Sequence, residues 1–202
     1  MKKLFLAVVC AFATTIVNAQ DAKTKLYRAI EIDNVDSVTA ALNAGANVNE
    51  SFPQEGYFKN DGYNDLTPVM KAAWGNKLNV LKVLLAQKKV KVNAVTDQQA
   101  NHSIVLKSIG QTQTLKVKGK TALHFAVYEG HFEAVKMLVD AGADPLLEME
   151  VKFPSKVYRN GIYVKEATFA ARKLAEEKGF TEMEEYLKKA RNASLFKGFS
   201  GK

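Results

Sequence analysis

Apolar and polar residues follow a helical period in one central stretch of the chain, residues 121–144. A spacing of three and four positions predicts one buried helical face there, formed by Leu123, Ala126 and Val127. Gly130 and His131 break this period. A second apolar face follows, made of Phe132, Val135, Leu138 and Val139. Gly142 stands just beyond it, where a left-handed cap favours glycine because glycine has no Cβ. The stretch therefore predicts two short helices joined by a turn.

The pattern of this stretch recurs three more times along the chain. Thr67-Pro68-Val69-Met70 and Thr24-Lys25-Leu26-Tyr27 each align with its opening, Thr121-Ala122-Leu123-His124. The counterparts of Ala126 are Ala29, Ala72 and Ala175. Helices this short are unstable alone, so such units must stack to bury their apolar faces. We predict one domain over residues 20–190, a C-terminal tail over 191–202, and repeat units at about 22–50, 65–94, 119–145 and 168–190.

These units resemble the ankyrin repeat. The resemblance is carried by the Thr121-Ala122-Leu123-His124 opening, the Glu129-Gly130-His131 turn and the Gly142-Ala143-Asp144 end. It implies a mostly α-helical solenoid of about four helix-turn-helix repeats. It also implies a structural His124, whose ring hydrogen-bonds Thr121 and neighbouring loop backbone.

The spacing between units exceeds that of the family. The aligned alanines are 43, 54 and 49 residues apart, whereas an ankyrin repeat takes about 33 residues. The extra residues all fall between a second helix and the next first helix, where the resemblance implies a β-hairpin finger. We therefore expect elongated β-hairpin finger insertions on one face, which is often the binding face. Neutral drift in surface loops is the alternative.

Aromatic and basic residues in these connections are the candidate binding residues. The first connection, residues 51–65, is rich in aromatic side chains, which are common interface anchors. The predicted partner-binding residues are Phe52, Tyr57, Phe58, Tyr63, Trp74, Lys107, Tyr158, Arg159 and Tyr163. Two alternatives stay open: Phe52 and one tyrosine pack back on the stack, and Trp74 either lines the concave face or packs between repeats.

The second and third connections contain strand patterns. Residues 103–109 and 112–117 predict two strands that turn at Gly110-Gln111. Asn160-Gly161 is typical of a type I′ hairpin turn, which would pair Tyr158 with Tyr163. Apolar residues alternate with charged ones just before it, which predicts a half-buried strand, at Leu147, Met149, Val151 and Phe153.

The first 19 residues have the parts of a secretory signal peptide. Two lysines precede an apolar run, and Val17 and Ala19 are the small residues of a cleavage site. We expect cleavage, no stable membrane anchor afterwards, and export to a bacterial periplasm; secretion is the alternative. An uncleaved anchor is disfavoured because the run is shorter than the roughly 20 residues that span a bilayer. Cys10 is the only cysteine and lies in this segment, so the mature chain would have no disulfide.

The remaining sequence offers no pattern typical of catalysis. It contains no Gly-x-Ser-x-Gly elbow, no His-Glu-x-x-His and no phosphate-binding loop, so we predict no catalytic residues, no metal site and no cofactor. The 29 basic and 21 acidic side chains give a net charge of +8. The positive charges are spread over all units, which favours a mixed solvated surface and disfavours nucleic acid as a partner. Attraction to an acidic partner is the alternative.

Two function classes remain. The first is an exported protein-binding module, monomeric when free, that inhibits or protects a periplasmic enzyme such as a peptidoglycan hydrolase. The inhibitor hypothesis rests on the export signal, on fingers long enough to enter a cleft, and on similarity to exported bacterial ankyrin proteins. The second class is a periplasmic scaffold that supports another enzyme, for example an oxidative-stress enzyme, or a host-directed binding protein.

Overall fold

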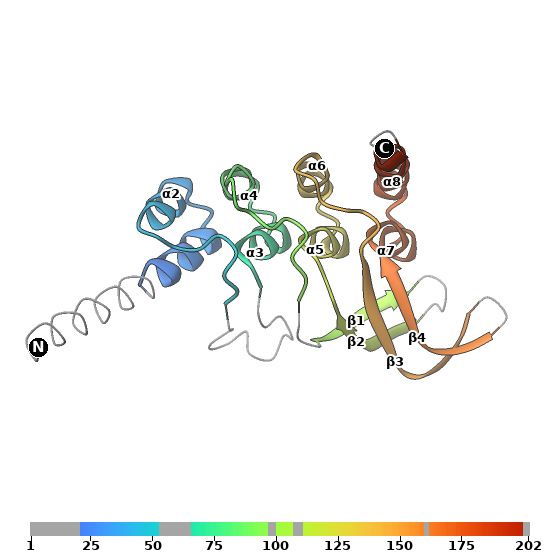
Figure 1. The fold of residues 1–202 in the computed structure, drawn as a ribbon. Helices are drawn as coiled ribbons and strands as arrows, with labels where there is room; N and C mark the ends of the chain where they lie inside the picture. Colours follow the sequence, from blue (N-terminus) through green and yellow to red (C-terminus); the bar gives the residue numbers. More distant parts are fainter. Residues whose placement is uncertain (1–20, 53–65, 97–99, 107–110, 160–161, 200–202) are drawn as a thin grey trace, which may run out of the picture.

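The computed structural model describes residues 21–52, 66–96, 100–106, 111–159 and 162–199. These residues contain four helix pairs that stand side by side (Figure 1). A helix over residues 21–31 pairs with α2 (Val35–Asn43), α3 (Pro68–Trp74) with α4 (Leu78–Leu85), α5 (Ala122–Glu129) with α6 (Phe132–Asp140), and α7 (Ala171–Lys178) with α8 (Thr181–Phe199). The fold is mostly helical, as the sequence predicts.

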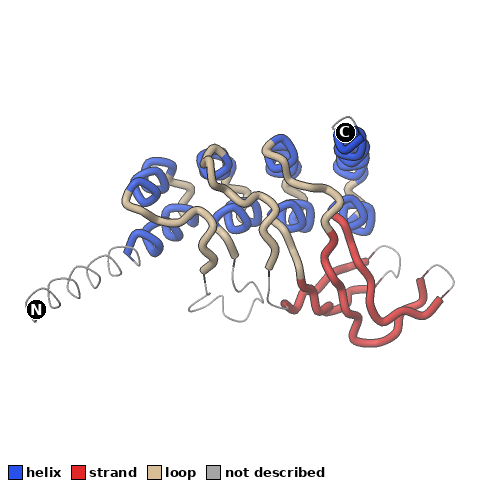
Figure 2. The backbone as a smooth tube through the Cα atoms, in the orientation of Figure 1, coloured by secondary structure: helices blue, strands red, loops and turns tan. Residues whose placement is uncertain are grey.

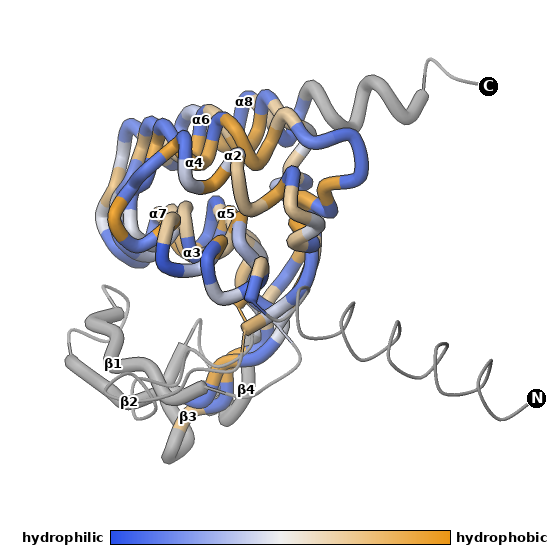
Figure 3. The backbone as a smooth tube through the Cα atoms, turned by 90° about the vertical axis from the view of Figure 1, so that its left-hand side faces the viewer, coloured by the Kyte–Doolittle hydropathy of each residue, from blue (hydrophilic) through white to orange (hydrophobic). Residues whose placement is uncertain are grey.

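The helix pairs form two parallel rows. α3 contacts α5 and α5 contacts α7, while α2 contacts α4 and α4 contacts α6. The first helices form an inner row between the second helices and the strands, and Figure 3, which looks along the stack, shows the same order of layers. The predicted helical faces are confirmed: Leu123, Ala126, Val127, Val135 and Leu138 are buried. Phe132 and Val139 are half-buried against the same core.

The first helix of every pair ends with the same hydrogen bond. The carbonyl of the aligned alanine accepts from the N–H five residues later: Ala29 from Asn34 at 3.0 Å, and Ala72, Ala126 and Ala175 from Lys77, His131 and Phe180 at 2.9 Å. The residue before each donor has a positive φ: Asp33 54°, Asn76 52°, Gly130 79° and Gly179 78°. This combination is the Schellman helix end. The four aligned alanines therefore occupy equivalent places in the structure.

Two asparagines link neighbouring units in the same way. Asn49 accepts from the N–H of Lys91 at 2.7 Å and donates to the carbonyl of Lys89 at 2.7 Å. Asn93 accepts from the N–H of Asp144 at 2.8 Å and donates to the carbonyl of Gly142 at 3.2 Å. A side-chain amide offers both a donor and an acceptor, so each asparagine satisfies two backbone groups of the next unit. These bonds fix the spacing between successive units.

The strands form one antiparallel sheet in sequence order (Figure 2). They are β1 (Ala100–Leu106), β2 (Gln111–Lys118), β3 (Glu148–Arg159) and β4 (Ile162–Ala170). Tyr158 pairs with Tyr163, which is the register that the sequence predicts. The first strand differs from the expected 103–109: β1 begins at Ala100, because Ala100 pairs with Val117 at the base of β2. Residues 107–110, with part of the predicted turn, lie outside the described residues.

One face of β2 and β3 covers the inner row. Val117, Met149, Val151 and Phe153 are 2% exposed or less, while Lys116, Lys118, Glu150 and Lys152 are exposed. This is the alternation that the sequence predicts for β3. The sheet thus adds its apolar face to the core of the stack.

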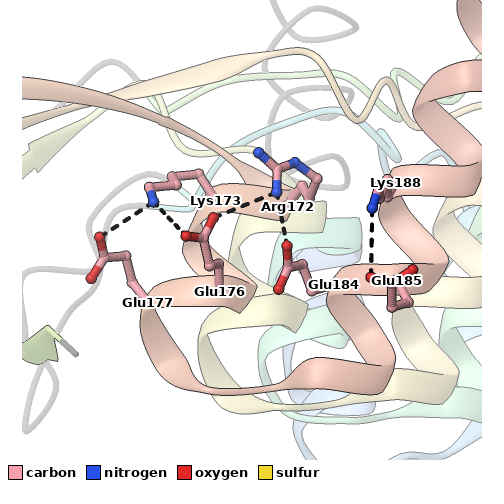
Figure 4. A network of polar contacts seen from close by, with 7 residues as sticks. All are labelled: Arg172, Lys173, Glu176, Glu177, Glu184, Glu185 and Lys188. Carbon is pink, nitrogen blue, oxygen red and sulfur yellow. Dashed lines mark hydrogen bonds and ion pairs between the residues drawn. The ribbon is translucent and has the colours of Figure 1, made fainter. Parts of the chain in front are cut away.

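An ion pair connects the two helices of the last pair, and further ion pairs lie within each helix (Figure 4). Arg172 on α7 donates to Glu184 on α8 at 2.8 Å and lies 3.5 Å from Glu176, while Lys173 donates to Glu176 at 2.8 Å. Such partly exposed pairs stabilise little singly but more as a network. α8 continues to Phe199, so most of the predicted tail 191–202 belongs to this last helix.

Candidate functional site

A row of charged and aromatic side chains runs along the ends of the first helices. The positions two residues beyond the aligned alanines hold Glu31, Trp74, Tyr128 and Glu177. Other residues of the same turns contact them, and the contacts run from the first helix pair to the last. We call six of these residues the inner stripe: Glu31, Lys71, Trp74, Tyr128, Glu129 and Lys178.

Lys71 links the first two helix pairs within the inner stripe. Its ammonium lies 3.2 Å from a Glu31 carboxylate oxygen, 4.9 Å from the Tyr27 ring centroid and 5.1 Å from the Trp74 ring centroid. Lys71 is 8% exposed, and a buried charge needs such an ionic partner and ring faces to offset lost hydration. Because the lysine is held from both sides, the Trp74 ring beside it is held as well.

Trp74 links the second and third helix pairs. Its indole Nε1–H donates to Glu129 at 3.0 Å, so α3 is joined to α5 through the side chain. Its backbone carbonyl accepts from the His131 ring at 3.0 Å. The ring is half-buried. The Trp74 side chain therefore connects neighbouring units while it remains half-buried.

Tyr128 and Lys178 continue the inner stripe to the last helix pair. The Lys178 ammonium lies 4.4 Å from the Tyr128 ring centroid. Burial raises the pKa of the Tyr128 phenol above its usual value, and the neighbouring Glu129 carboxylate adds to the shift. The phenol therefore stays neutral at physiological pH. Tyr128 also borders the sheet, because it shares a small cavity with Val117 and Met149.

A shallow pocket opens beside Trp74. It has a volume of about 340 Å³ and is lined by Ile30, Glu31, Lys71, Trp74, Gly75 and Lys77. Ile32, next in sequence to its wall, is 70% exposed. The arrangement offers fixed rings, paired charges and an apolar recess, which suit the binding of another surface.

His124 has the structural role that the sequence predicts. Its Nδ1 accepts from the Thr121 N–H at 3.2 Å, so Nε2 carries the proton and donates to the Phe169 carbonyl at 3.0 Å. The pKa of His124 is lowered from 6.5 to about 4, chiefly by burial; the bond to Phe169 opposes this shift, and the nearby Lys120 charge adds to it. The ring is therefore neutral at physiological pH and ties α5 to the end of β4.

The predicted partner-binding residues do not all lie at one place in the structure. Trp74 belongs to the inner stripe. Phe52 is 7% exposed and stacks on Tyr27 with 4.2 Å between centroids, so it packs on the stack and has no surface left for a large contact. Its neighbour across an isolated bridge is Leu66. Tyr57, Phe58, Tyr63 and Lys107 lie outside the described residues. For Tyr158, Arg159 and Tyr163 the structure describes the strands β3 and β4 but not the side chains.

Sequence reasoning missed most of the inner stripe. It singled out Trp74 and not Glu31, Lys71, Glu129 or Lys178. The aligned alanines were the available signal, because the residues at fixed offsets from them come together at the helix ends.

In the described part of the chain, no helix is both long and apolar enough to cross a membrane. The same residues contain no group of three or more His, Cys, Asp or Glu side chains placed to hold a metal ion.

Comparison with protein-family models finds a match over residues 59–149, to the model described as ankyrin repeats (3 copies). Ankyrin repeats are found within residues 59–149. A comparison with curated proteins finds no match. Ankyrin repeats generally mediate protein–protein interaction, and domains built from them are typically non-catalytic. The matched ankyrin repeats include Trp74 and Tyr128, the two aromatic residues of the inner stripe.

Proposed function

We propose that this chain is an exported protein-binding module that holds its partner with the inner stripe and the long connections beside it. The observation that carries the proposal is the fixed position of Trp74, between Lys71 and Glu129 and beside an apolar pocket. Rings that are already held in place lose little entropy on binding, and Trp and Tyr are enriched among the residues that dominate interface energies.

The proposal includes four ankyrin units with finger insertions. The first and last helix pairs lie outside the residues that the family model matches, but their first helices end in the same hydrogen bond as the others. The hairpins β1–β2 and β3–β4 both occupy the junction between a second helix and the next first helix. These two observations support a continuous array whose long connections lie on one side.

The partner that we propose is a bacterial periplasmic enzyme, such as a peptidoglycan hydrolase, which the chain inhibits or protects. The support comes from the signal-peptide pattern of residues 1–19, which lie outside the described residues, and from connections long enough to enter a cleft. The protein would act as a monomer, since one inner stripe suffices to hold one partner.

A capture experiment tests this function. Chain lacking residues 1–19 is immobilised, exposed to periplasmic extract, and compared with the variants Trp74→Ala and Tyr186→Ala. Tyr186 is the matched control, because it is a half-buried aromatic residue of the outer row. We expect one stoichiometric partner that is lost with Trp74→Ala and kept with Tyr186→Ala. An identical set of captured proteins for wild type and Trp74→Ala would refute binding through the inner stripe.

An enzyme assay then separates inhibition from tethering. If the captured partner is a hydrolase, its rate on peptidoglycan should fall as wild-type chain is added and recover with Trp74→Ala. An unchanged rate in a stable complex would remove the inhibitor part of the proposal and leave a scaffold. Trp74→Phe keeps an aromatic ring at this position but loses the hydrogen bond to Glu129. It serves as a second variant in case Trp74→Ala unfolds the protein.

A further inference from the structure

Acidic residues are absent from one segment of the chain. Residues 66–96 contain six lysines and no Asp or Glu, although the whole chain has 21 acidic side chains. This segment forms α3, α4 and the turns after α4. The second helix pair is therefore the basic part of a stack whose other pairs carry both signs of charge.

Four lysines on α4 and in the turns after it are exposed. They are Lys82, Lys88, Lys89 and Lys91. Within the described residues none of these four forms an ion pair. By contrast, Lys136 on α6 lies 3.3 Å from Glu133, and Lys188 on α8 lies 3.7 Å from Glu185. Uncompensated charges of one sign on one surface attract an oppositely charged partner.

Two of these lysines border a groove between the first two helix pairs. The groove has a volume of about 580 Å³. Its apolar lining includes Val48, which is buried, and Leu42 and Ala46, which are half-buried; we call these three residues the apolar floor. Lys88 and Lys89 are exposed at its rim. The rim is held in place, because the Asn49 side chain donates to the Lys89 carbonyl at 2.7 Å.

We propose that this groove docks an extended acidic segment of a protein partner. A carboxylate pairs with the lysines at the rim, and an apolar side chain of the same segment covers the floor. The volume lies in the usual range of about 300–1,000 Å³ for binding pockets, so it admits a few side chains. A nucleic-acid backbone or a flat lipid surface would satisfy the lysines but leave the apolar floor uncovered. This surface is separate from the inner stripe.

A labelled peptide tests the groove directly. The probe is a short fluorescein-labelled peptide built from the repeat Asp-Leu-Glu-Ser, and its binding to the full chain is followed by fluorescence anisotropy. We expect saturable binding that weakens with salt, because exposed charges are screened. A peptide with lysine at the acidic positions should not bind. A peptide with serine in place of leucine should bind more weakly, because it cannot cover the floor.

Matched variants locate the binding site. Lys88→Gln with Lys89→Gln should weaken binding at least about tenfold, as expected for loss of close charge pairs. Lys188→Gln with Lys189→Gln removes the same charge from an adjacent exposed pair on α8 and should change affinity less than about twofold. Ala46→Trp fills the groove without changing charge and should also abolish binding. Trp74→Ala leaves this groove intact and should bind the peptide normally. The test of the groove is therefore independent of the test of the inner stripe.

Several results would overturn the docking proposal. Equal weakening by the two lysine variants would show that net charge alone attracts the peptide. Unchanged binding in Ala46→Trp would show that the groove is not used. No saturable binding, or tighter binding of phosphatidylglycerol vesicles or duplex DNA that depends on Lys88 and Lys89, would assign these lysines to another class of partner.

Discussion

The left-handed position that ends each first helix is filled by two kinds of residue. Gly130 and Gly179 adopt it without strain, since glycine has no Cβ. Asp33 and Asn76 adopt it in the first two units, which Asp and Asn tolerate better than other residues because their short side chains can hydrogen-bond locally. The same turn therefore differs in its tolerance to substitution from unit to unit.

We predict that Gly130→Ala destabilises the protein more than Gly179→Ala. The two glycines have φ of 79° and 78°, so the backbone cost is the same, about 1–2 kcal/mol. A Cβ at Gly130 would also lie 3.1 Å from the Phe180 ring, whereas one at Gly179 would meet nothing within 4 Å. Urea titration of both variants measures the difference. Equal losses would mean that Phe180 does not pack on this turn.

The burial of His124 predicts a loss of stability in acid. Its pKa is about 4 in the folded chain against 6.5 when exposed. Between these values the unfolded chain binds a proton that the folded chain does not, so the free energy of unfolding falls as pH falls from 6.5 toward 4. The slope reaches about 1.4 kcal/mol per pH unit at most.

The variant His124→Gln isolates this contribution. It should be less stable than wild type at pH 7, because the hydrogen bond to the Phe169 carbonyl is lost. It should also lose the part of the acid dependence that His124 supplies, which urea titrations between pH 7 and pH 4.5 would reveal. A slope identical to that of wild type would contradict the assignment.

At the scale of elements, sequence patterns were most informative where contacts are local. The helices around Leu123 and Leu138 follow from spacing alone, and the turn at Gly130 follows from glycine chemistry. The start of β1 does not, because Ala100 and Asn101 carry no strand signal and are ordered by pairing with β2. The Phe169 carbonyl, 45 residues from His124, could not be predicted for the same reason.

Helix α6 provides the stability test at this scale. Leu138 is 0% exposed, so Leu138→Ala should lower the free energy of unfolding by roughly 2–5 kcal/mol through lost contacts and a residual cavity. Lys189→Ala, at an exposed position of α8, should change it by less than about 0.5 kcal/mol. A loss for Leu138→Ala no larger than that for Lys189→Ala, measured by urea titration, would mean that α6 packs through another face.

At the scale of the whole molecule, the stack separates two surfaces. The inner stripe joins the ends of the first helices, and the lysine-bordered groove lies beside the end of α4 in the outer row. The repeat spacing predicted the stack because each unit contacts only its neighbours. It could not predict the inner stripe, because a lysine in such a sequence is expected at the surface. In the structure Lys71 is instead buried, with Glu31 and Tyr27 of the first unit and Trp74 of its own helix as neighbours.

Amide hydrogen exchange of the full chain, alone and bound to its captured partner, tests most directly whether the inner stripe is the binding surface. We predict slower exchange in α3 and α5, which carry Trp74 and Tyr128, and unchanged exchange in α6 of the outer row. Slower exchange in α6 with none in α3 or α5 would contradict the account, because the partner would then sit on the opposite side of the stack.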